Sequence, residues 1–447
     1  QPYVLLTLPN LLISAAVIYS IAALTKNSLA TYVGAVGVGI LYLIIVNQGL
    51  GNETLESLID PFALTSMQRL TAYWTPSEKT SRLIGFPGII VLNRFLWLSL
   101  ATGLLAFLYA RFNFTAAGLR GGRRSLRAPG ETDELVRHAI ASVPQSRRRF
   151  GARTRFAQLA PITRHSMADI MRNRVFLVIV VGMLALVFMF GWEVGAIVFD
   201  TSTWPVTHLI AGTALSVPVT IVFTVLTSIV AGELVWKERD VGAGDIAAAA
   251  PIPDWIPFVG RLIALVLLLS LLQLVLMAAG VTIQVLQGYY RFEPLLYLKI
   301  LFGMNLLDYV IWAAFAMAVH VVVNHKNLGH AVVIATWAFT LLAPGFFQIR
   351  HNLLLFNGDP GWIYSDMNGF GPFLGPFLWF KAYWGAWALL LAVIATIFWV
   401  RSTEGGLRAR MRLARLRMNG AAGLAAAAAA VLVISTGRFV FYNTNVL

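Results

Sequence analysis

The sequence predicts an all-α membrane protein, a polytopic helical bundle with about ten transmembrane helices. Hydrophobic residues make up 58% of the 447 residues, against roughly 45–50% in soluble domains, and charged residues make up 12%, about half the usual ~25%. The mean hydropathy is +0.74. Because disordered chains are poor in apolar residues, this composition excludes disorder as well as an ordinary soluble domain.

The apolar residues gather in ten segments, each long enough for the ~20 residues that a spanning helix needs. Backbone polar groups inside a bilayer must be hydrogen-bonded within the segment, so we expect helices. The alternating ~10-residue segments that are typical of a membrane barrel do not occur in the sequence. The predicted spans cover residues 3–24, 29–48, 87–110, 175–200, 208–232, 257–284, 296–323, 331–348, 376–400 and 420–441.

The net charge of +14 lies in two short stretches. From Arg111 to Arg174 fourteen arginines oppose four acidic residues, which leaves +10, and from Arg401 to Arg417 six arginines oppose one glutamate, which leaves +5. Basic stretches beside membrane spans stay in the cytoplasm. Six predicted spans separate the two stretches, and because this number is even, both stretches can lie inside.

This assignment orients the predicted spans. The expected cytoplasmic loops are 25–28, 233–256 and 324–330, and the expected external loops are 49–86, 201–207, 285–295 and 349–375. Both ends of the chain are then extracytoplasmic. The chain begins at Gln1 with no signal-peptide pattern, and we expect it to be a portion of a longer protein.

An internal repeat relates predicted helices one to three to helices seven to nine. Residues 20–35 align with residues 320–335, with a Lys-Asn pair at the same place in both. A long external loop follows in each copy, and the helix after it carries Arg94 or Lys381 beside aromatic residues. The offset of six helices predicts a parallel pseudo-repeat of two six-helix halves. The alternative is that two hydrophobic stretches resemble each other by composition alone.

The repeat divides the chain into four parts. Residues 1–112 are expected to be the last three helices of a first half, and residues 113–152 a basic cytoplasmic linker. Residues 153–403 are expected to form a complete six-helix half that begins with an amphipathic helix. Residues 404–447 add a cytoplasmic Arg-rich segment and an extra transmembrane helix that ends outside.

The amphipathic helix is predicted from residues 153–174, where apolar side chains recur at three- and four-residue steps among arginines. Pro161 is expected to break or start the helix, which favours 162–174 as the helical span. The alternative is a basic tether that only sets the topology. Nucleic acid is a poor partner for these arginines because no aromatic platform accompanies them.

The cytoplasmic loop 233–256 is the first candidate site. It combines charges of both signs, an alanine run and two prolines, which favours a short amphipathic coupling helix that docks on a partner. The alternative is a solvated loop with ordinary ion pairs. The candidate coupling residues are Glu233, Trp236, Glu238, Arg239, Asp240, Asp245, Pro251 and Pro253.

Charged residues within the predicted spans form a second group, because charges in a bilayer usually face protein or water. They are Arg94, Asp308 and Lys381, and Arg94 and Lys381 occupy matching repeat positions. They either line a polar path or form structural ion pairs. The external loops carry a third group, in short re-entrant helices that cap an exit or seat an external domain. Its members are Asp60, Trp74, Asp366 and Asn368.

Several loop segments resemble one branch of the ABC-2 type transporter permeases. The coupling loop GELVWKERDVGAGDIAAAAPIP carries that branch's pattern, and the resemblance covers nearly the whole chain except residues 113–152. The segments that carry it are 60–80, 232–253, 288–302, 323–330, 364–384 and 438–447.

The resemblance implies a permease subunit of an ATP-driven exporter in a bacterial cytoplasmic membrane. The sequence has no GxxxxGK[ST] phosphate loop, so ATP and Mg²⁺ are expected on separate ABC ATPase subunits at the cytoplasmic face. In that branch an extracytoplasmic M1 aminopeptidase-type domain follows the permease, but no HExxH motif occurs here. We therefore expect no catalytic residue, metal site or cofactor in this chain. The alternatives are a membrane anchor for such a peptidase and a secondary transporter.

Overall fold

A computed structural model describes the chain in two units, which span Gln1–Thr154 and Arg155–Leu447. The described residues are 3–25, 31, 34–35, 37–39, 42, 52–83, 85, 87–111, 151–194, 201, 203–349, 351–399, 406–418 and 420–446. Within these ranges the chain is helical and contains no strand, apart from an isolated bridge between Ser365 and Gly369.

Nine helices among the described residues are long and apolar enough to cross a membrane. They coincide with nine of the ten predicted spans, which confirms an all-α, multi-pass membrane protein. Most of the other predicted span, 29–48, and nearly all of the linker 113–152 lie outside the described residues. The nine are Tyr3–Thr25, Gly88–Arg111, Arg174–Trp192, Val219–Asp240, Trp255–Leu286, Pro294–Val323, Lys326–Phe346, Gly371–Phe398 and Ala421–Asn445.

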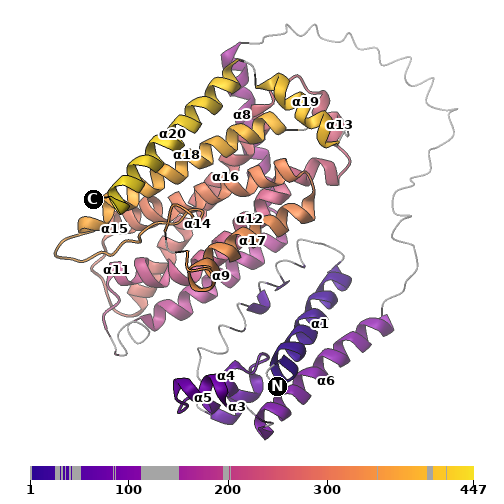
Figure 1. The fold of residues 1–447 in the computed structure, drawn as a ribbon, viewed down its shortest axis with the longest axis vertical. Helices are drawn as coiled ribbons and strands as arrows, with labels where there is room; N and C mark the ends of the chain where they lie inside the picture. Colours follow the sequence, from indigo (N-terminus) through magenta and orange to yellow (C-terminus); the bar gives the residue numbers. More distant parts are fainter. Residues whose placement is uncertain are drawn as a thin grey trace, which may run out of the picture. The chain divides into compact units, whose positions relative to one another are not determined.

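The first unit packs two long helices against each other and closes one end with short ones (Figure 1). Ile13 and Ala16 of α1 meet Ala101 of α6, with Trp97 and Leu98 packed against them. The elements are η1 (Tyr3–Thr7), α1 (Leu8–Thr25), α3 (Glu53–Ile59), α4 (Leu64–Leu70), α5 (Pro76–Ser81) and α6 (Gly88–Arg111).

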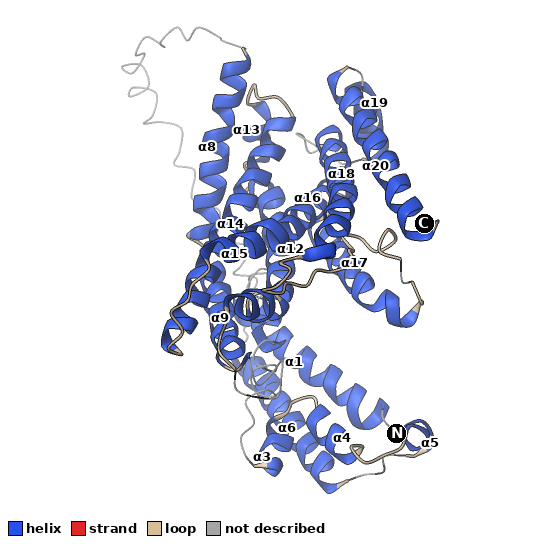
Figure 2. Cartoon of the chain, turned by 90° about the vertical axis from the view of Figure 1, so that its left-hand side faces the viewer, coloured by secondary structure: helices blue, strands red, loops and turns tan. Residues whose placement is uncertain are grey.

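The second unit is a bundle that begins with α8 and ends with α20 (Figures 1 and 2). Its first half comprises α8 (Ala152–Met171), α9 (Arg174–Trp192), α11 (Thr207–Leu209), η3 (Ile210–Ala214), α12 (Val217–Asp240), α13 (Gly244–Ala249) and α14 (Trp255–Leu286). Its second half comprises α15 (Pro294–Leu298), η4 (Lys299–Asn305), α16 (Leu306–Val323), α17 (Lys326–Phe346), η5 (Gly371–Phe373), α18 (Leu374–Phe398), α19 (Leu407–Arg417) and α20 (Ala421–Asn445).

Helix α12 is the centre of this bundle. In the most apolar window of α12, 72% of the residues are buried, whereas the figure for α20 is 11%. Helix α12 contacts α9, α14, α16 and α17, while the main contact of α20 is with α18. A hydrogen bond also joins α12 to α16, in which the Trp312 indole N–H donates to Ser228 Oγ at 3.1 Å. Helix α12 is therefore placed to transmit a movement to several spans.

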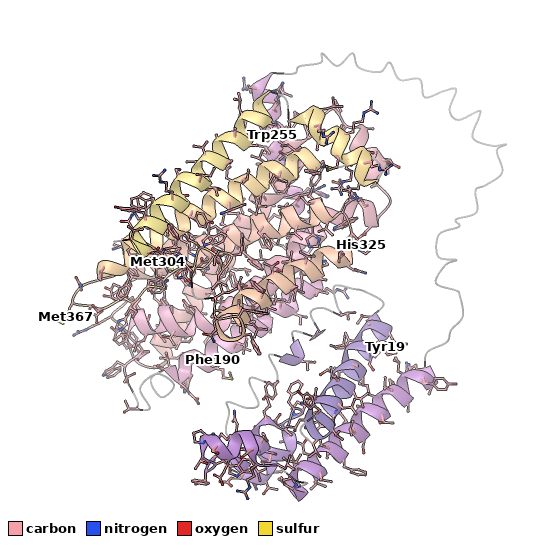
Figure 3. The ribbon with its side chains drawn as sticks, in the orientation of Figure 1. Tyr19, Phe190, Trp255, Met304, His325 and Met367 are labelled. Carbon is pink, nitrogen blue, oxygen red and sulfur yellow. The ribbon has the colours of Figure 1, made fainter. Side chains whose placement is uncertain are left out.

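The predicted cytoplasmic and external loops of the second unit lie at opposite ends of the bundle. Trp255 and His325, which border two predicted cytoplasmic loops, lie at one end of the bundle, and Met367 of a predicted external loop lies at the other (Figure 3). Helices α13 and α19 both lie at the end with Trp255 and His325, and the chain terminus after α20 lies at the opposite end (Figure 1).

Helix α8 corrects one expectation. Pro161 does not break it, since the helix runs from Ala152 to Met171 with the proline inside. A proline removes one backbone hydrogen bond from a helix. Here tertiary contacts support both sides of it, because the Phe156 ring contacts Trp255 at 6.2 Å and Thr163 Oγ1 donates to Gly260 O at 3.0 Å. Packing against α14 therefore supports a helix that continues past the proline.

Candidate functional site

The candidate coupling residues lie at the end of α12 and in α13. The expected loop 233–256 is wrong at its start, because α12 continues as a helix to Asp240. Hydropathy ends at about residue 232, but helical hydrogen bonds continue where the side chains become polar. Residues Glu233, Trp236, Glu238, Arg239 and Asp240 thus occupy the last turns of a spanning helix, and Asp245 begins the short α13.

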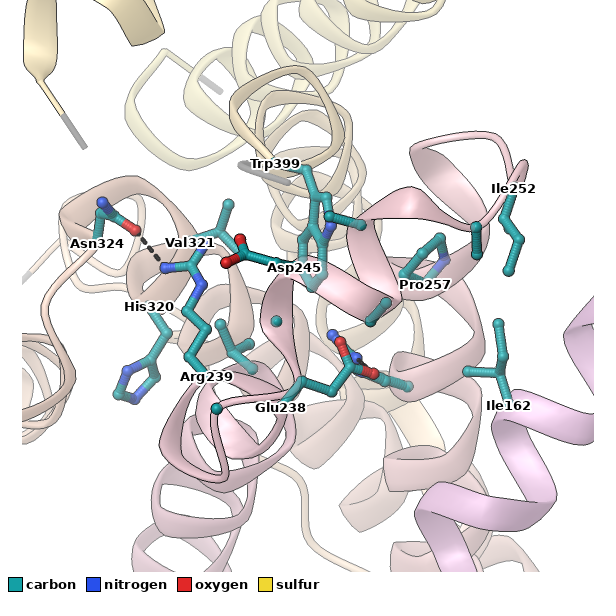
Figure 4. Close-up of a pocket in the computed structure, with 17 residues that line it drawn as sticks. Ile162, Glu238, Arg239, Asp245, Ile252, Pro257, His320, Val321, Asn324 and Trp399 are labelled. Atoms are coloured by element: carbon teal, nitrogen blue, oxygen red, sulfur yellow. Dashed lines mark hydrogen bonds and ion pairs between the residues drawn. The ribbon is translucent and has the colours of Figure 1, made fainter. Parts of the chain in front are cut away.

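Lysine 326 ties the end of α12 to α17. Its Nζ lies 2.8 Å from Glu233 Oε1 and 2.6 Å from Asp240 Oδ2. Beside it, Arg239 Nη1 donates to Asn324 Oδ1 at 2.6 Å, the bond drawn in Figure 4. Three of the predicted coupling residues therefore bond to the turn between α16 and α17.

Two more ion pairs connect the same end of α12 to other helices. Glu238 pairs with Arg261 of α14, whose guanidinium stacks on the Trp399 ring at 5.1 Å. Lys237 pairs with Asp169 of α8. Arg239 also stacks on Trp236, at 4.9 Å from the ring centroid. The end of α12 is consequently joined to α8, α14 and α17, which the sequence did not indicate because each partner is distant along the chain.

A pocket of about 450 Å³ opens beside these pairs (Figure 4). Charged and polar groups lie on one part of its wall and the alanines of α13 on another. Its lining residues are Ile162, Val235, Glu238, Arg239, Gly242, Gly244, Asp245, Ala247, Ala248, Ala250, Ile252, Pro257, Arg261, His320, Val321, Asn324 and Trp399.

The corner between α12 and α13 exposes apolar side chains. Val241 is 70% exposed and Ile246 is 79% exposed. Pro251 is exposed as well, and Pro253 is half-buried. These apolar side chains lie beside the exposed Asp245 and next to charges of α12 that bond within the chain. The corner is the most exposed part of the predicted coupling loop.

Two buried histidines lie next to this region and were missed in the sequence. His320 and His330 have ring centroids 4.5 Å apart and are almost fully buried. They pack against Gly232 of α12 and Gly329 of α17, where a Cβ at either glycine would overlap an imidazole ring. Glycines at positions 232 and 329, which leave room for the two imidazole rings, are a signal in the sequence that could have indicated this packing. Among the described residues, no group of three His, Asp or Glu side chains is arranged to hold a metal.

The predicted deep charge Lys381 lies in a polar cluster at the other end of the second unit. Its side chain is 3% exposed, pairs with Asp308 of α16 and lies 2.6 Å from Asp359 Oδ2 of the external loop. Its Nζ also donates to Asn357 O at 3.0 Å. The nearby Trp384 indole donates to Gly358 O at 2.9 Å. These bonds agree with the ion-pair interpretation of Lys381 and Asp308.

The predicted deep charge Arg94 lies in a similar cluster in the first unit. Arg94 Nη1 donates to Asn10 Oδ1 of α1 at 2.6 Å, and Nη2 donates to Pro61 O of the external loop at 2.9 Å. The Trp97 indole donates to Leu58 O at 2.9 Å. In each unit, then, a basic residue joins an earlier long helix, α1 or α16, to the external loop, and a tryptophan three positions later bonds to the loop backbone.

The helices that supply the third member of each cluster also correspond. Helices α1 and α16 each have 18 residues and each follow a π-helical segment. Asn10 and Asp308 are both the third residue of their helix. The sequence alignment indicated the match of Arg94 with Lys381, whereas the match of Asn10 with Asp308 emerges only from these contacts.

The four predicted external-loop residues have separate structural contacts. Asp60 is fully buried and accepts from Phe62 N at 2.8 Å and Thr65 N at 2.7 Å, so it supports the start of α4. Trp74 lies under the guanidinium of Arg82 at 4.8 Å.

Asp366 and Asn368 belong to the second loop. Asp366 Oδ1 lies 3.4 Å from His208 Nδ1, and the Asn368 backbone N–H donates to Ser365 Oγ at 3.2 Å. The predicted short helices occur in the first loop as α3, α4 and α5, while the second loop has only the turn η5 within its described residues.

Comparisons with known proteins add no relative. No protein-family model matches the chain, no curated protein matches it, and no solved structure matches it.

Proposed function

We propose that this chain is the permease subunit of an ATP-driven exporter of the ABC-2 type, located in a bacterial cytoplasmic membrane. Separate ABC ATPase subunits dock on its cytoplasmic end and bind the ATP and Mg²⁺. The proposal is supported by the resemblance of the loop segments, above all residues 232–253. It is also supported by the bundle of apolar helices around α12.

The observation that carries the proposal is the construction of the α12–α13 corner. Val241 and Ile246 are exposed at its tip, while the charged residues directly behind them bond to α8, α14 and α17. A partner that pushes on the tip would therefore move the ends of several helices together. Such a rigid connection is what the coupling of an external ATPase to a membrane path requires.

The two polar clusters support a second part of the proposal, the parallel pseudo-repeat. In each unit the same kinds of contact fix the external loop to the two long helices. We propose that residues 1–112 are the last helices of one half and residues 153–403 a complete second half.

Copurification from native membranes tests the docking. The tagged full chain should recover an ATPase with a P-loop. Ile246→Glu should lower the yield of that ATPase by roughly tenfold or more, because an apolar side chain that the bound partner would bury is replaced by a charge. Ile363→Glu is the matched control, since Ile363 is 64% exposed in the opposite external loop. Equal yields from the two variants, or no ATPase with the unaltered chain, would overturn the docking surface.

The exposed apolar residues are better test positions than the charges. Substitution of Glu238, Arg239 or Asp240 would break bonds within the chain, so a loss of partner binding would not be distinguishable from a local structural change. Ile246 has no such role, because its side chain is open to solvent.

The alternative function is a membrane anchor for an extracytoplasmic M1-type peptidase, without transport. It predicts that a partner ATPase with an inactivated P-loop leaves peptidase activity at the membrane unchanged. The transporter proposal predicts instead that the same inactivation abolishes ATP-dependent export in reconstituted vesicles. A secondary transporter would work from an ion gradient without ATP in that assay.

A further inference from the structure

Helix α19 lies between two candidate spans. Helix α18 ends at Phe398 and α20 begins at Ala421, so the 11 residues of α19 belong to a connection that leaves and re-enters the apolar layer at the same end of the bundle. Figure 1 and Figure 2 both place α19 at the end where α20 begins. This position brings α19 to the level of the membrane surface.

Two arginines on the inner face fix how α19 is rotated. Arg410 donates to Val321 O at 2.8 Å and to Val322 O at 3.0 Å, at the C-terminal end of α16. Arg417 donates to Ile397 O at 3.0 Å and pairs with Asp254 at 3.1 Å. The last carbonyls of a helix lack partners in the helix and carry partial negative charge, so guanidinium groups stabilise them.

The outer face carries three further arginines among exposed apolar side chains. Arg408, Arg412 and Arg415 are exposed, and within the described part of the chain no acidic side chain forms an ion pair with them. Spacings of three and four residues place them on one side of the helix, where like charges repel each other. With the exposed apolar residues they line a shallow groove of about 490 Å³. The apolar members are Leu407, Met411 and Leu416.

We propose that the outer face of α19 binds the phosphate groups of anionic phospholipids in the adjacent leaflet. Guanidinium groups form charge-assisted, often bidentate bonds to phosphate oxygens. The leucines and the methionine on the same face enter the boundary of the acyl chains, as in other amphipathic helices at a membrane surface. The charge of the lipid offsets the repulsion among the three arginines.

Three features favour lipid over a soluble anion. The face combines charge with large apolar side chains, its helix is held at the surface by two neighbouring spans, and the inner arginines keep it from turning over. Neutral lipid offers the apolar contact without the net charge, and free phosphate offers the charge without the apolar contact. The inference does not depend on whether the chain transports a substrate.

The test uses the full chain, purified in neutral detergent and freed of lipid. Phosphatidylglycerol is titrated in mixed micelles, and bound lipid is counted by native mass spectrometry. The triple variant R408Q/R412Q/R415Q should bind phosphatidylglycerol roughly a hundredfold more weakly, from about 1 kcal/mol per arginine. The matched variant R408K/R412K/R415K, which keeps the charge, should lose about fivefold or less.

Further arms make the outcome decisive. Phosphatidylcholine should bind the unaltered chain and the glutamine variant alike, and inorganic phosphate should not compete with phosphatidylglycerol. Unchanged phosphatidylglycerol binding in the glutamine variant overturns the proposal, and effective competition by inorganic phosphate replaces the lipid with a free anion. If the triple variant does not fold, Arg412→Gln alone should still weaken binding by about fivefold. No loss in that single variant would also overturn the proposal.

Discussion

The two units hold their external loops with the same arrangement of contacts but with different charges. In the second unit Lys381 lies between two carboxylates, those of Asp308 and Asp359. In the first unit Arg94 bonds to neutral acceptors, the Asn10 side chain and the Pro61 carbonyl. One architecture is therefore built once from an ion network and once from a largely neutral network.

The chemistry of the two cations explains the difference. A lysine ammonium is a compact charge that needs an opposite charge when it leaves water, whereas a guanidinium spreads its charge over five N–H donors and can be satisfied by several neutral acceptors. The buried Asp60 carboxylate of the first loop does not pair directly with Arg94. It accepts hydrogen bonds from the backbone N–H groups of Phe62 and Thr65. The comparison teaches that the position of a basic residue can be kept while its partners change.

The largest expected effect is on the ion network. Lys381→Met leaves Asp308 and Asp359 without their cation and should lower the free energy of unfolding by about 3–5 kcal/mol. Arg94→Met leaves no directly paired carboxylate, because Asp60 acts on Arg94 only through its charge, and should cost about 1–3 kcal/mol. Thermal or denaturant unfolding in detergent micelles measures both.

The rescue variant K381M/D308N/D359N checks the cause of that loss. If unpaired carboxylates are responsible, removal of both charges should restore a large part of the lost stability. Equal losses for the two single variants would mean that the clusters differ in sequence only and not in energetics.

A smaller effect is expected where the two clusters are alike. Trp97 and Trp384 each donate to a loop carbonyl at 2.9 Å, so Trp97→Phe and Trp384→Phe should each cost about 1–2 kcal/mol. Hydrogen exchange of the two external loops measures how firmly each is held. A loss in one unit but not the other would show that the shared geometry does not carry a shared role.

Exchanging the third members of the clusters should have a smaller effect still. Asp308→Asn gives the second unit the residue of the first and should cost about 1 kcal/mol, because Asp359 still pairs with Lys381. Asn10→Asp adds a carboxylate beside Arg94 but loses the donation from Asn10 Nδ2 to Phe62 O, which leaves a change within about 1 kcal/mol. Stability curves of N10D with and without Arg94 give the coupling energy between the two residues.

The smallest effect concerns the first loop alone and depends on pH. The Thr75 backbone N–H donates to the Glu78 carboxylate and lowers the pKa of that group, in the capping box of α5. A carboxyl group whose pKa is lower in the folded state stabilises the fold at a pH above its unfolded-state pKa of about 4.3. This stabilisation is lost as the pH falls through the folded-state pKa. Hydrogen exchange of α5 should therefore show local opening below about pH 4.

Glu78→Gln is the control for this pH dependence. It should remove the change in α5 protection with pH, while the second loop, which lacks this capping box in its described part, should behave alike in both proteins. Unchanged pH dependence in the variant would assign the opening to other carboxylates.

Much of the fold was predictable because a bilayer imposes a local requirement. The nine candidate spans of the described residues coincide with predicted ones, and the matching positions of Arg94 and Lys381 were visible in the alignment of the two halves. The end of α12 was not predictable from hydropathy, because the helix continues for two turns beyond the apolar residues. The passage of α8 through Pro161 depended on packing against α14.

The sequence drew attention to residues 233–256 but did not indicate which contacts they make. Glu233, Glu238, Arg239 and Asp240 were expected to face a partner, yet each bonds within the chain. Their partners Lys326, Arg261 and Asn324 carry no local signal. The open part of the surface carries the apolar Val241 and Ile246 beside the exposed Asp245.

Hydrophobicity and charge along the chain were enough to predict the membrane class and the spans, since both act through the solvent around each segment. Which charges meet depended on how the helices pack. Arg239 and Asn324 lie 85 residues apart in the sequence, and Arg94 and Asn10 lie 84 apart. Residues so far apart in the sequence come together only through the packing of helices. In a medium of low dielectric constant, the partner that a buried charge finds there decides whether the charge stabilises or destabilises the bundle.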